Sequence, residues 1–144
     1  MADGSLSSVD AEFRVQRAVM AAIRVDEDVR RVFGAPPRVY DDETRGPAYP
    51  YANLERHETR PAGSAGVAGI AHTLTLSVSS RFGGRAYTKE AVGALRAAVE
   101  RAEVSPDGQR IVLIYAAYGD VFRTSDQQTF RGILRIRIIS EEIV

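Results

Sequence analysis

The amino-acid sequence predicts an α+β domain with a mostly antiparallel β-sheet and helices packed on one face. Helical and strand patterns do not alternate strictly along the chain, and a long hairpin pattern ends it. The two clearest strand patterns each keep one polar face, which places the helices on the other face. With 144 residues, the chain suits one domain. We expect residues 1–8 to form a flexible lead, residues 9–140 the domain and residues 141–144 a C-terminal tail.

The N-terminal part of the chain predicts two helices. The first covers residues 8–25, where these apolar side chains recur at helical spacing on one face: Val15, Ala18, Val19, Ala22 and Ile23. The second is short, over residues 26–33, and Gly34 with the prolines that follow it ends the helical pattern.

Three extended segments follow, at residues 38–40, 49–58 and 72–80. A turn rich in helix- and strand-breaking residues, 41–47, separates the first two. The third has the clearest strand pattern, in which Leu74, Leu76 and Val78 alternate with Thr73, Thr75, Ser77 and Ser79.

Residues 60–69 separate the second and third extended segments. Gly63, Gly66 and Gly69 stand three residues apart there, among small side chains that can bury little surface. We therefore predict a flexible loop.

The C-terminal half predicts a helix over residues 87–102, a turn at 105–108 and a hairpin. Residues 111–118 are apolar on both faces, as in a central strand. A two-layer domain covers only one of those faces, so we expect another subunit to cover the second. The interface residues predicted from this strand are Val112, Ile114 and Tyr118.

The last strand pattern, residues 129–139, carries a basic stripe. Its apolar residues alternate with Arg131, Arg135 and Arg137. Three interpretations stay open: an exposed face balanced by acids on a neighbouring strand, an interface with acidic partner residues, or the wall of a channel that passes DNA.

Composition excludes several classes of protein. The chain has no cysteine, which rules out disulfides, thiolate zinc sites and a cysteine nucleophile. Nineteen basic and nineteen acidic residues cancel, so no global field gathers nucleic acid or a charged membrane. No apolar run is long enough to span a bilayer, and we expect no membrane partner. Eighteen of the basic residues are arginine, which fits either a GC-rich genome or subunit interfaces.

The sequence predicts no enzyme, cofactor or metal. Gly63, Gly66 and Gly69 precede a strand instead of opening a helix, so they do not form a dinucleotide-binding fingerprint. The alternative is a small metal-dependent hydrolase, in which His57 would act with Glu55, on the same strand face, and with nearby carboxylates. His72 is predicted to be a hydrogen-bonded histidine at the edge of the core.

At this point the chain resembles the tail-completion, or tail terminator, proteins of long non-contractile phage tails and of phage-derived gene transfer agents. The resemblance covers residues 9–139 and rests on the order of these segments: Gly34-Ala35-Pro36-Pro37, Arg38-Val39-Tyr40-Asp41, Ala48-Tyr49-Pro50-Tyr51, HTLTLSVSSR at 72–81, Gly84-Arg85-Ala86, Val121-Phe122-Arg123 and FRGILRIR at 130–137.

The resemblance implies a hexameric ring that caps the tail tube, stops its polymerisation and docks to the neck or stopper protein. It implies that double-stranded DNA passes through the ring without specific recognition, and that neither catalysis nor a cofactor is involved. Assembly would take place in the bacterial cytoplasm, and the protein would leave in the particle at the junction of tail and neck. The loop 60–69 would dock on the tube or the neck. A second possibility is another neck, head-completion or minor tail protein of the same particle.

Overall fold

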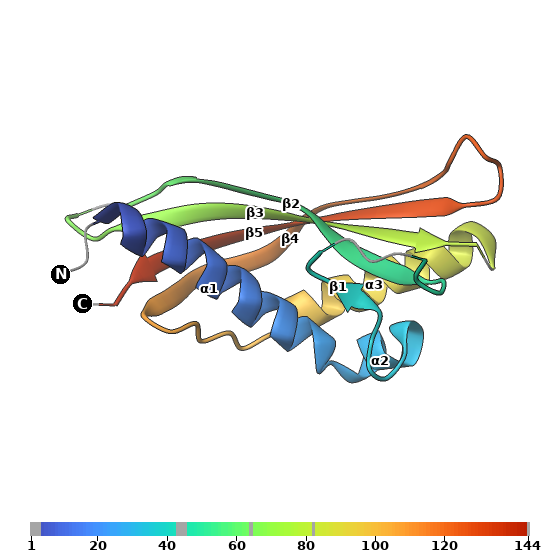
Figure 1. The fold of residues 1–144 in the computed structure, drawn as a ribbon, viewed down its shortest axis with the longest axis horizontal. Coiled ribbons are helices and arrows are strands. Elements are labelled where there is room, and N and C mark those ends of the chain that lie inside the picture. The colour runs from blue at the N-terminus through green and yellow to red at the C-terminus, as the bar shows by residue number, and fades with distance from the viewer. Residues whose placement is uncertain (1–3, 43–45, 64, 82, 144) are drawn as a thin grey trace.

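The computed structural model describes residues 4–42, 46–63, 65–81 and 83–143, which form a single α+β unit (Figure 1). The helices are α1 (Gly4–Arg24), α2 (Glu27–Phe33) and α3 (Gly84–Arg101). The strands are β1 (Val39–Tyr40), β2 (Tyr51–Pro61), β3 (Gly69–Ser80), β4 (Gln109–Arg123) and β5 (Phe130–Glu142). They form one sheet in the order β1-β2-β3-β5-β4, antiparallel except for the short β1–β2 pair. All three helices lie on one side of it, which confirms the predicted fold class.

Several boundaries differ from the sequence-based prediction. Helix α1 begins at Gly4, so residues 4–8 of the predicted lead are helical. Strand β5 continues to Glu142, into the predicted tail, because its end pairs with the start of β4. The loop predicted over residues 60–69 shrinks to 62–68, since Pro61 pairs with Ile70 and the hairpin ladder reaches the turn.

Strand β4 is an edge strand, and its predicted central position is wrong. It pairs with β5 alone among the described strands. Its apolar character on both faces has a different cause. Ile111, Ile114, Ala116 and Val121 pack against the core, whereas the opposite side chains lie on the helix-free face of the sheet.

The core lies between the helices and the inner face of the sheet. From the strands it receives Leu74, Leu76, Val78, Leu134, Ile136 and Ile138, and from the helices Val15, Val19, Ile23, Leu95 and Val99, all fully buried. These are the apolar stripes that the sequence pattern predicts. Burying each such side chain contributes about 1.5–3 kcal/mol to folding.

A buried polar chain fastens α1 to the sheet. His57 Nε2 lies 2.9 Å from His72 Nδ1, and His72 Nε2 lies 2.9 Å from the Ser140 hydroxyl. At the other end, His57 Nδ1 is 3.4 Å from Oε1 of Gln16 on α1. Because that amide oxygen can only accept, His57 Nδ1 carries the proton and donates it to Gln16. His57 Nε2 then accepts from His72 Nδ1, and His72 Nε2 accepts from the Ser140 hydroxyl. Each imidazole then holds one proton and is neutral.

Burial opposes a second proton on either ring. It lowers the pKa of His57, against the attraction of Glu12, and it lowers the pKa of His72 to about 4, with His57 adding to the effect. His72 is 0% exposed and hydrogen-bonded on both nitrogens. The expected core-edge role of His72 is thus confirmed.

We expect the protein to lose stability as the pH falls from about 7 toward 4. The unfolded chain titrates His72 near the ordinary pKa of 6.5 and the folded chain near 4, so between these values the unfolded state binds the proton first. The stability is therefore fully present above the unfolded pKa, and acid removes up to about 3 kcal/mol of it. Urea unfolding at pH values of about 7.5 and 4.5 measures the loss.

The matched control is His72→Gln, whose amide can still bond Ser140 but does not titrate. We expect this variant to lose about 2–3 kcal/mol less than the natural chain over the same pH interval. Equal losses in the two proteins would contradict the assignment to His72.

A second prediction concerns the contact of α3 with β5. A methyl group on Gly132 would collide with Val92 and would meet Val78 Cβ at 3.4 Å, so Gly132→Ala should destabilise the fold by about 1–3 kcal/mol. At Gly93, within α3, no atom lies within 4 Å of the added carbon, so Gly93→Ala should stabilise by about 0.5–1 kcal/mol. Thermal unfolding of both variants checks the opposite signs.

Candidate assembly surface

The helix-free face of the sheet, called here the open face, carries the predicted arginines. Arg131 lies opposite Ser79 on one side and Phe122 on the other. Arg135 lies opposite Thr75 and Tyr118, and Arg137 opposite Thr73 and Tyr115. The arginine stripe thus runs between a polar strand and an aromatic one.

Large apolar and aromatic side chains stand exposed on the β4 part of this face. Leu113 is 48% exposed, Tyr115 41%, Tyr118 44% and Phe122 40%. The Arg135 guanidinium lies over the Tyr118 ring, 4.6 Å from its centroid. Neighbouring exposed apolar side chains of this size are typical of a surface that another protein covers.

The predicted interface residues divide between the two faces. Tyr118 lies on the open face, and Val112 is 53% exposed at a β-bulge. Ile114 pairs with Ile138 and is partly buried against the core, on the opposite face of the strand, and its assignment to the interface stays a prediction. Sequence reasoning missed Leu113, Tyr115 and Phe122, because the bulges after Ile111 and Ala116 shift the alternation of the strand.

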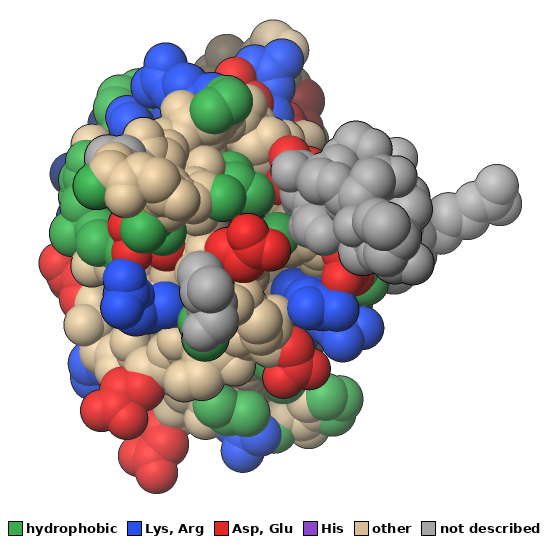
Figure 2. Space-filling model, turned by 90° about the vertical axis from the view of Figure 1, so that its left-hand side faces the viewer, with side chains coloured by type: hydrophobic (Ala, Val, Ile, Leu, Met, Phe, Trp, Pro, Cys, Tyr) green, Lys and Arg blue, Asp and Glu red, His purple; other side chains and the backbone are tan. Residues whose placement is uncertain are grey.

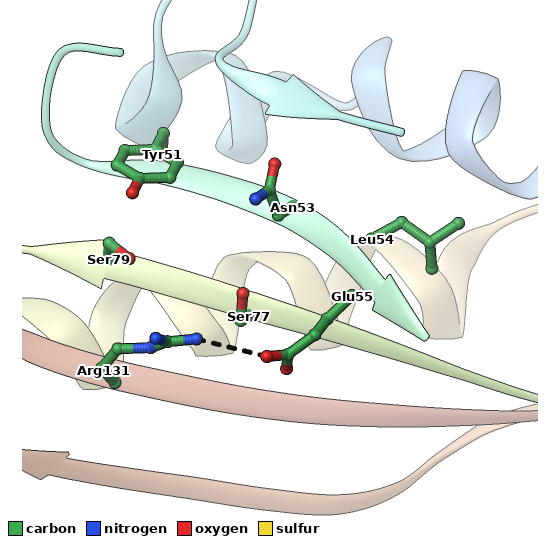
Figure 3. A pocket seen from close by; sticks show the side chains of 7 residues that line it. All are labelled: Tyr51, Asn53, Leu54, Glu55, Ser77, Ser79 and Arg131. Atoms are coloured by element: carbon green, nitrogen blue, oxygen red, sulfur yellow. Dashed lines mark ion pairs between the residues drawn. The ribbon is translucent and has the colours of Figure 1, made fainter. Parts of the chain in front are cut away.

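One of the three arginines has an acidic partner on the open face. Arg131 reaches across Ser79 and Ser77 to Glu55, at 3.5 Å (Figure 3). The guanidinium of Arg135 is stacked on an aromatic ring instead. For Arg137, the described residues contain no ion-pair partner. Within the described part of the chain, an acidic ion-pair partner on this face is thus found for Arg131 and not for Arg135 or Arg137.

A polar pocket of about 290 Å³ opens around the Arg131–Glu55 pair (Figure 3). Its lining also includes Tyr51, Asn53, Leu54, Ser77 and Ser79. Nε of Arg131 and Oδ1 of Asn53 are buried and have no hydrogen-bond partner within the described part of the chain. Buried polar atoms of this kind need water or a polar group from outside.

The predicted hydrolytic pair does not form. A bulge between Leu54 and Arg56 places Glu55 on the open face, whereas His57 faces the helices and bonds His72. Within the described residues, no group of three His, Cys, Asp or Glu side chains could hold a metal ion. The expectation that Glu55 and His57 share a face is therefore wrong.

The glycines of the predicted docking loop have conformational roles in the β2–β3 turn. Gly66 has a φ of +78°, in the left-handed region, and a Cβ on Gly63 would collide with the Val67 carbonyl. Gly69 begins β3, and its carbonyl accepts a hydrogen bond from the Ala62 N–H. Docking of the loop 60–69 on a partner stays a prediction.

The end of the molecule that carries both termini has a mixed surface. Figure 2 shows basic, acidic and hydrophobic side chains interspersed there, without segregation of one charge. Among the described helices, none has the length and apolar character that crossing a bilayer requires.

Comparison with known proteins relates the chain to a protein family and to a chain of a virion-type particle. The family model described as "Tail completion protein gp17" matches residues 17–141. Among solved structures, a chain of the "Virion of native gene transfer agent (GTA) particle" is similar, with 26% identity and a TM-score of 0.78. The match covers 88% of this chain and 94% of that one. No curated protein sequence matches the chain.

The family model extends over most of the chain, from Arg17 in α1 to Glu141 near the end of β5. The structural match also covers most of both chains. The chain belongs to the family of tail completion proteins, and it is a structural protein of a phage-type or gene transfer agent particle.

Proposed function

We propose that six copies of this chain close into a ring that caps the tail tube, ends its polymerisation and joins the tail to the neck. The observation that carries the proposal is the half-covered sheet. One face is packed by helices. The other presents exposed aromatic and aliphatic side chains on β4, the strand at the edge of the sheet. Such a surface is incomplete in a single copy and is expected to be covered by assembly.

Two different surfaces are needed for a ring, because head-to-tail contacts pair unlike patches. The sheet offers unlike edges, since β4 is a long strand of 15 residues and β1 a strand of two. The arginines of the open face then lie either against a neighbouring copy or along the passage for double-stranded DNA. Passage without tight binding fits a chain whose charges sum to zero.

The second candidate is another neck, head-completion or minor tail protein of the same particle. The mixed charge and apolar character at the terminal end suits contact with a further protein, as a neck component would need (Figure 2). The hydrolase alternative has lost its geometric basis, because Glu55 and His57 lie on opposite faces.

Deleting the gene from a strain that produces the particle should yield tails of unregulated, excessive length without heads. The reason is that an uncapped tube keeps adding subunits. Negative-stain electron microscopy measures the tail lengths, and a plasmid copy of the gene is the control. Tails of normal length that fail to join heads would favour the neck component, and intact infectious or transducing particles would contradict both functions.

Introducing an acidic side chain on the open face should disrupt assembly without unfolding the chain. Tyr118→Asp and Arg135→Glu change exposed side chains, so we expect melting temperatures close to that of the natural chain but at least tenfold weaker self-association. Analytical ultracentrifugation measures the association and calorimetry the stability. Phe13→Asp, at a 52% exposed residue of α1, is the matched control. Equal effects at all three positions would argue against the open face.

A further inference from the structure

A basic groove of about 520 Å³ lies between α3 and β4, separate from the open face. Its lining is formed by Arg85, Lys89, Val92, Gly93 and Arg96 from α3 and by Gly119, Asp120 and Val121 from β4. The α3 residues recur at spacings of three and four, so they share one face of the helix. The lining thus includes three basic residues and one acidic residue.

Glycines make this groove possible. A Cβ on Gly119 would collide with the Arg96 guanidinium, which therefore lies directly on the β4 backbone. Gly93 leaves open space on the α3 side, where no atom lies within 4 Å of the missing carbon. A side chain at Gly93 or Gly119 would fill or reshape the floor of the groove.

The positive charge of the groove is not neutralised within the described residues. Arg85, Lys89 and Arg96 have no ion pair there, and all three are exposed. The Arg85 guanidinium contacts the Phe130 ring at 6.0 Å from its centroid. The single acid, Asp120, lies 3.5 Å from the Tyr118 hydroxyl. The groove is therefore suited to a carboxylate from outside.

The opposite edge of the sheet supplies an acidic segment. Strand β1 is the last strand on that side, and Asp41 and Asp42 follow it directly. Asp41 is held by Arg24 and by Gln16, at 3.2 Å from the latter. Asp42 is exposed and has no ion pair among the described residues. Of the other acidic runs, residues 26–28 are engaged by Arg101 through Asp26 and Asp28. Glu141 and Glu142 end β5, which lies beside β4 and not at the opposite edge of the sheet.

We propose that the basic groove of one copy receives the acidic segment Asp41–Asp42 of a second copy, with Asp42 pairing with Arg96 or Lys89. The groove and the segment lie at opposite edges of one sheet and carry opposite charges, which is the arrangement that head-to-tail contacts require. The groove also adjoins β4, whose exposed apolar side chains lie on the other side of the same strand. This inference rests on the proposed ring.

Reciprocal charge reversal tests the pairing. We expect Arg96→Glu and Asp42→Arg each to weaken self-association at least tenfold in analytical ultracentrifugation. The double variant, which restores opposite charges at every contact of the ring, should return to within about threefold of the natural chain. Raising the salt from about 50 to about 500 mM should weaken the natural chain more than Arg96→Glu.

The matched control is Arg17→Glu, at an exposed arginine of α1 that has no ion pair among the described residues. Unchanged association in this variant separates the pairing from a general effect of charge. Failure of the double variant to recover would overturn the assignment of Asp42. Rings that form normally with both single variants would overturn the inference and leave the proposed function standing.

Cross-linking gives a second measurement, because the chain has no cysteine. A variant with Gly93→Cys and Asp42→Cys, treated with a short bismaleimide, should form a ladder of oligomers, whereas each single variant should not. A dimer from Gly93→Cys alone would show a two-fold contact and overturn the inference.

If the purified chain stays monomeric, the same variants are compared by tail length in the deletion strain. Normal tails with both single charge reversals would overturn the pairing. Normal tails in the deletion strain itself would instead contradict the proposed function.

Discussion

The position of β5 between β3 and β4 is the constraint on which the rest of this structure depends. Its alternation sends Leu134, Ile136 and Ile138 into the core and its arginines to the open face. Because directly paired residues on neighbouring strands point to the same face of the sheet, the register of β5 also fixes which residues of β3 and β4 are buried. A slip of one residue would exchange the apolar and basic faces. The core and the candidate assembly surface are therefore two consequences of one strand register.

The same register leaves one face of the sheet uncovered by the helices. The helices cover one face, and β4 leaves both an unpaired edge and exposed aromatic side chains. A monomer that remained free would expose an apolar strip next to an open strand edge, which promotes aggregation. The bulges in β4 interrupt that edge and reduce nonspecific strand addition. In the proposed ring, the bulges therefore favour contact through side chains and the basic groove over simple extension of the sheet.

The sequence predicts those parts of the fold that depend on regular alternation. Leu74, Leu76 and Val78 are buried as predicted, and so are the apolar residues of β5. The errors occur at bulges, where one extra residue reverses the face of every side chain that follows. This is why Ile114 packs against the core and why Glu55 and His57 lie on opposite faces. For the candidate site, the arginine stripe could be predicted, whereas the groove depends on the three-dimensional approach of Arg96 to Gly119.

The buried histidine chain connects the interior with the acidic edge. Gln16 on α1 contacts His57 through Oε1 and donates from Nε2 to Asp41 at 3.2 Å. The side-chain amide of Gln16 therefore links His57 to Asp41. Arg24 of the same helix bonds the Val39 carbonyl at 2.9 Å and pairs with Asp41. Helix α1 therefore holds both the core and the segment that follows β1. Any shift of α1 over the sheet would move Asp41 and Asp42 together, because their anchor on the helix is also the end of the histidine chain. The internal polar network thus presets the geometry of the edge that the neighbouring copy is proposed to bind.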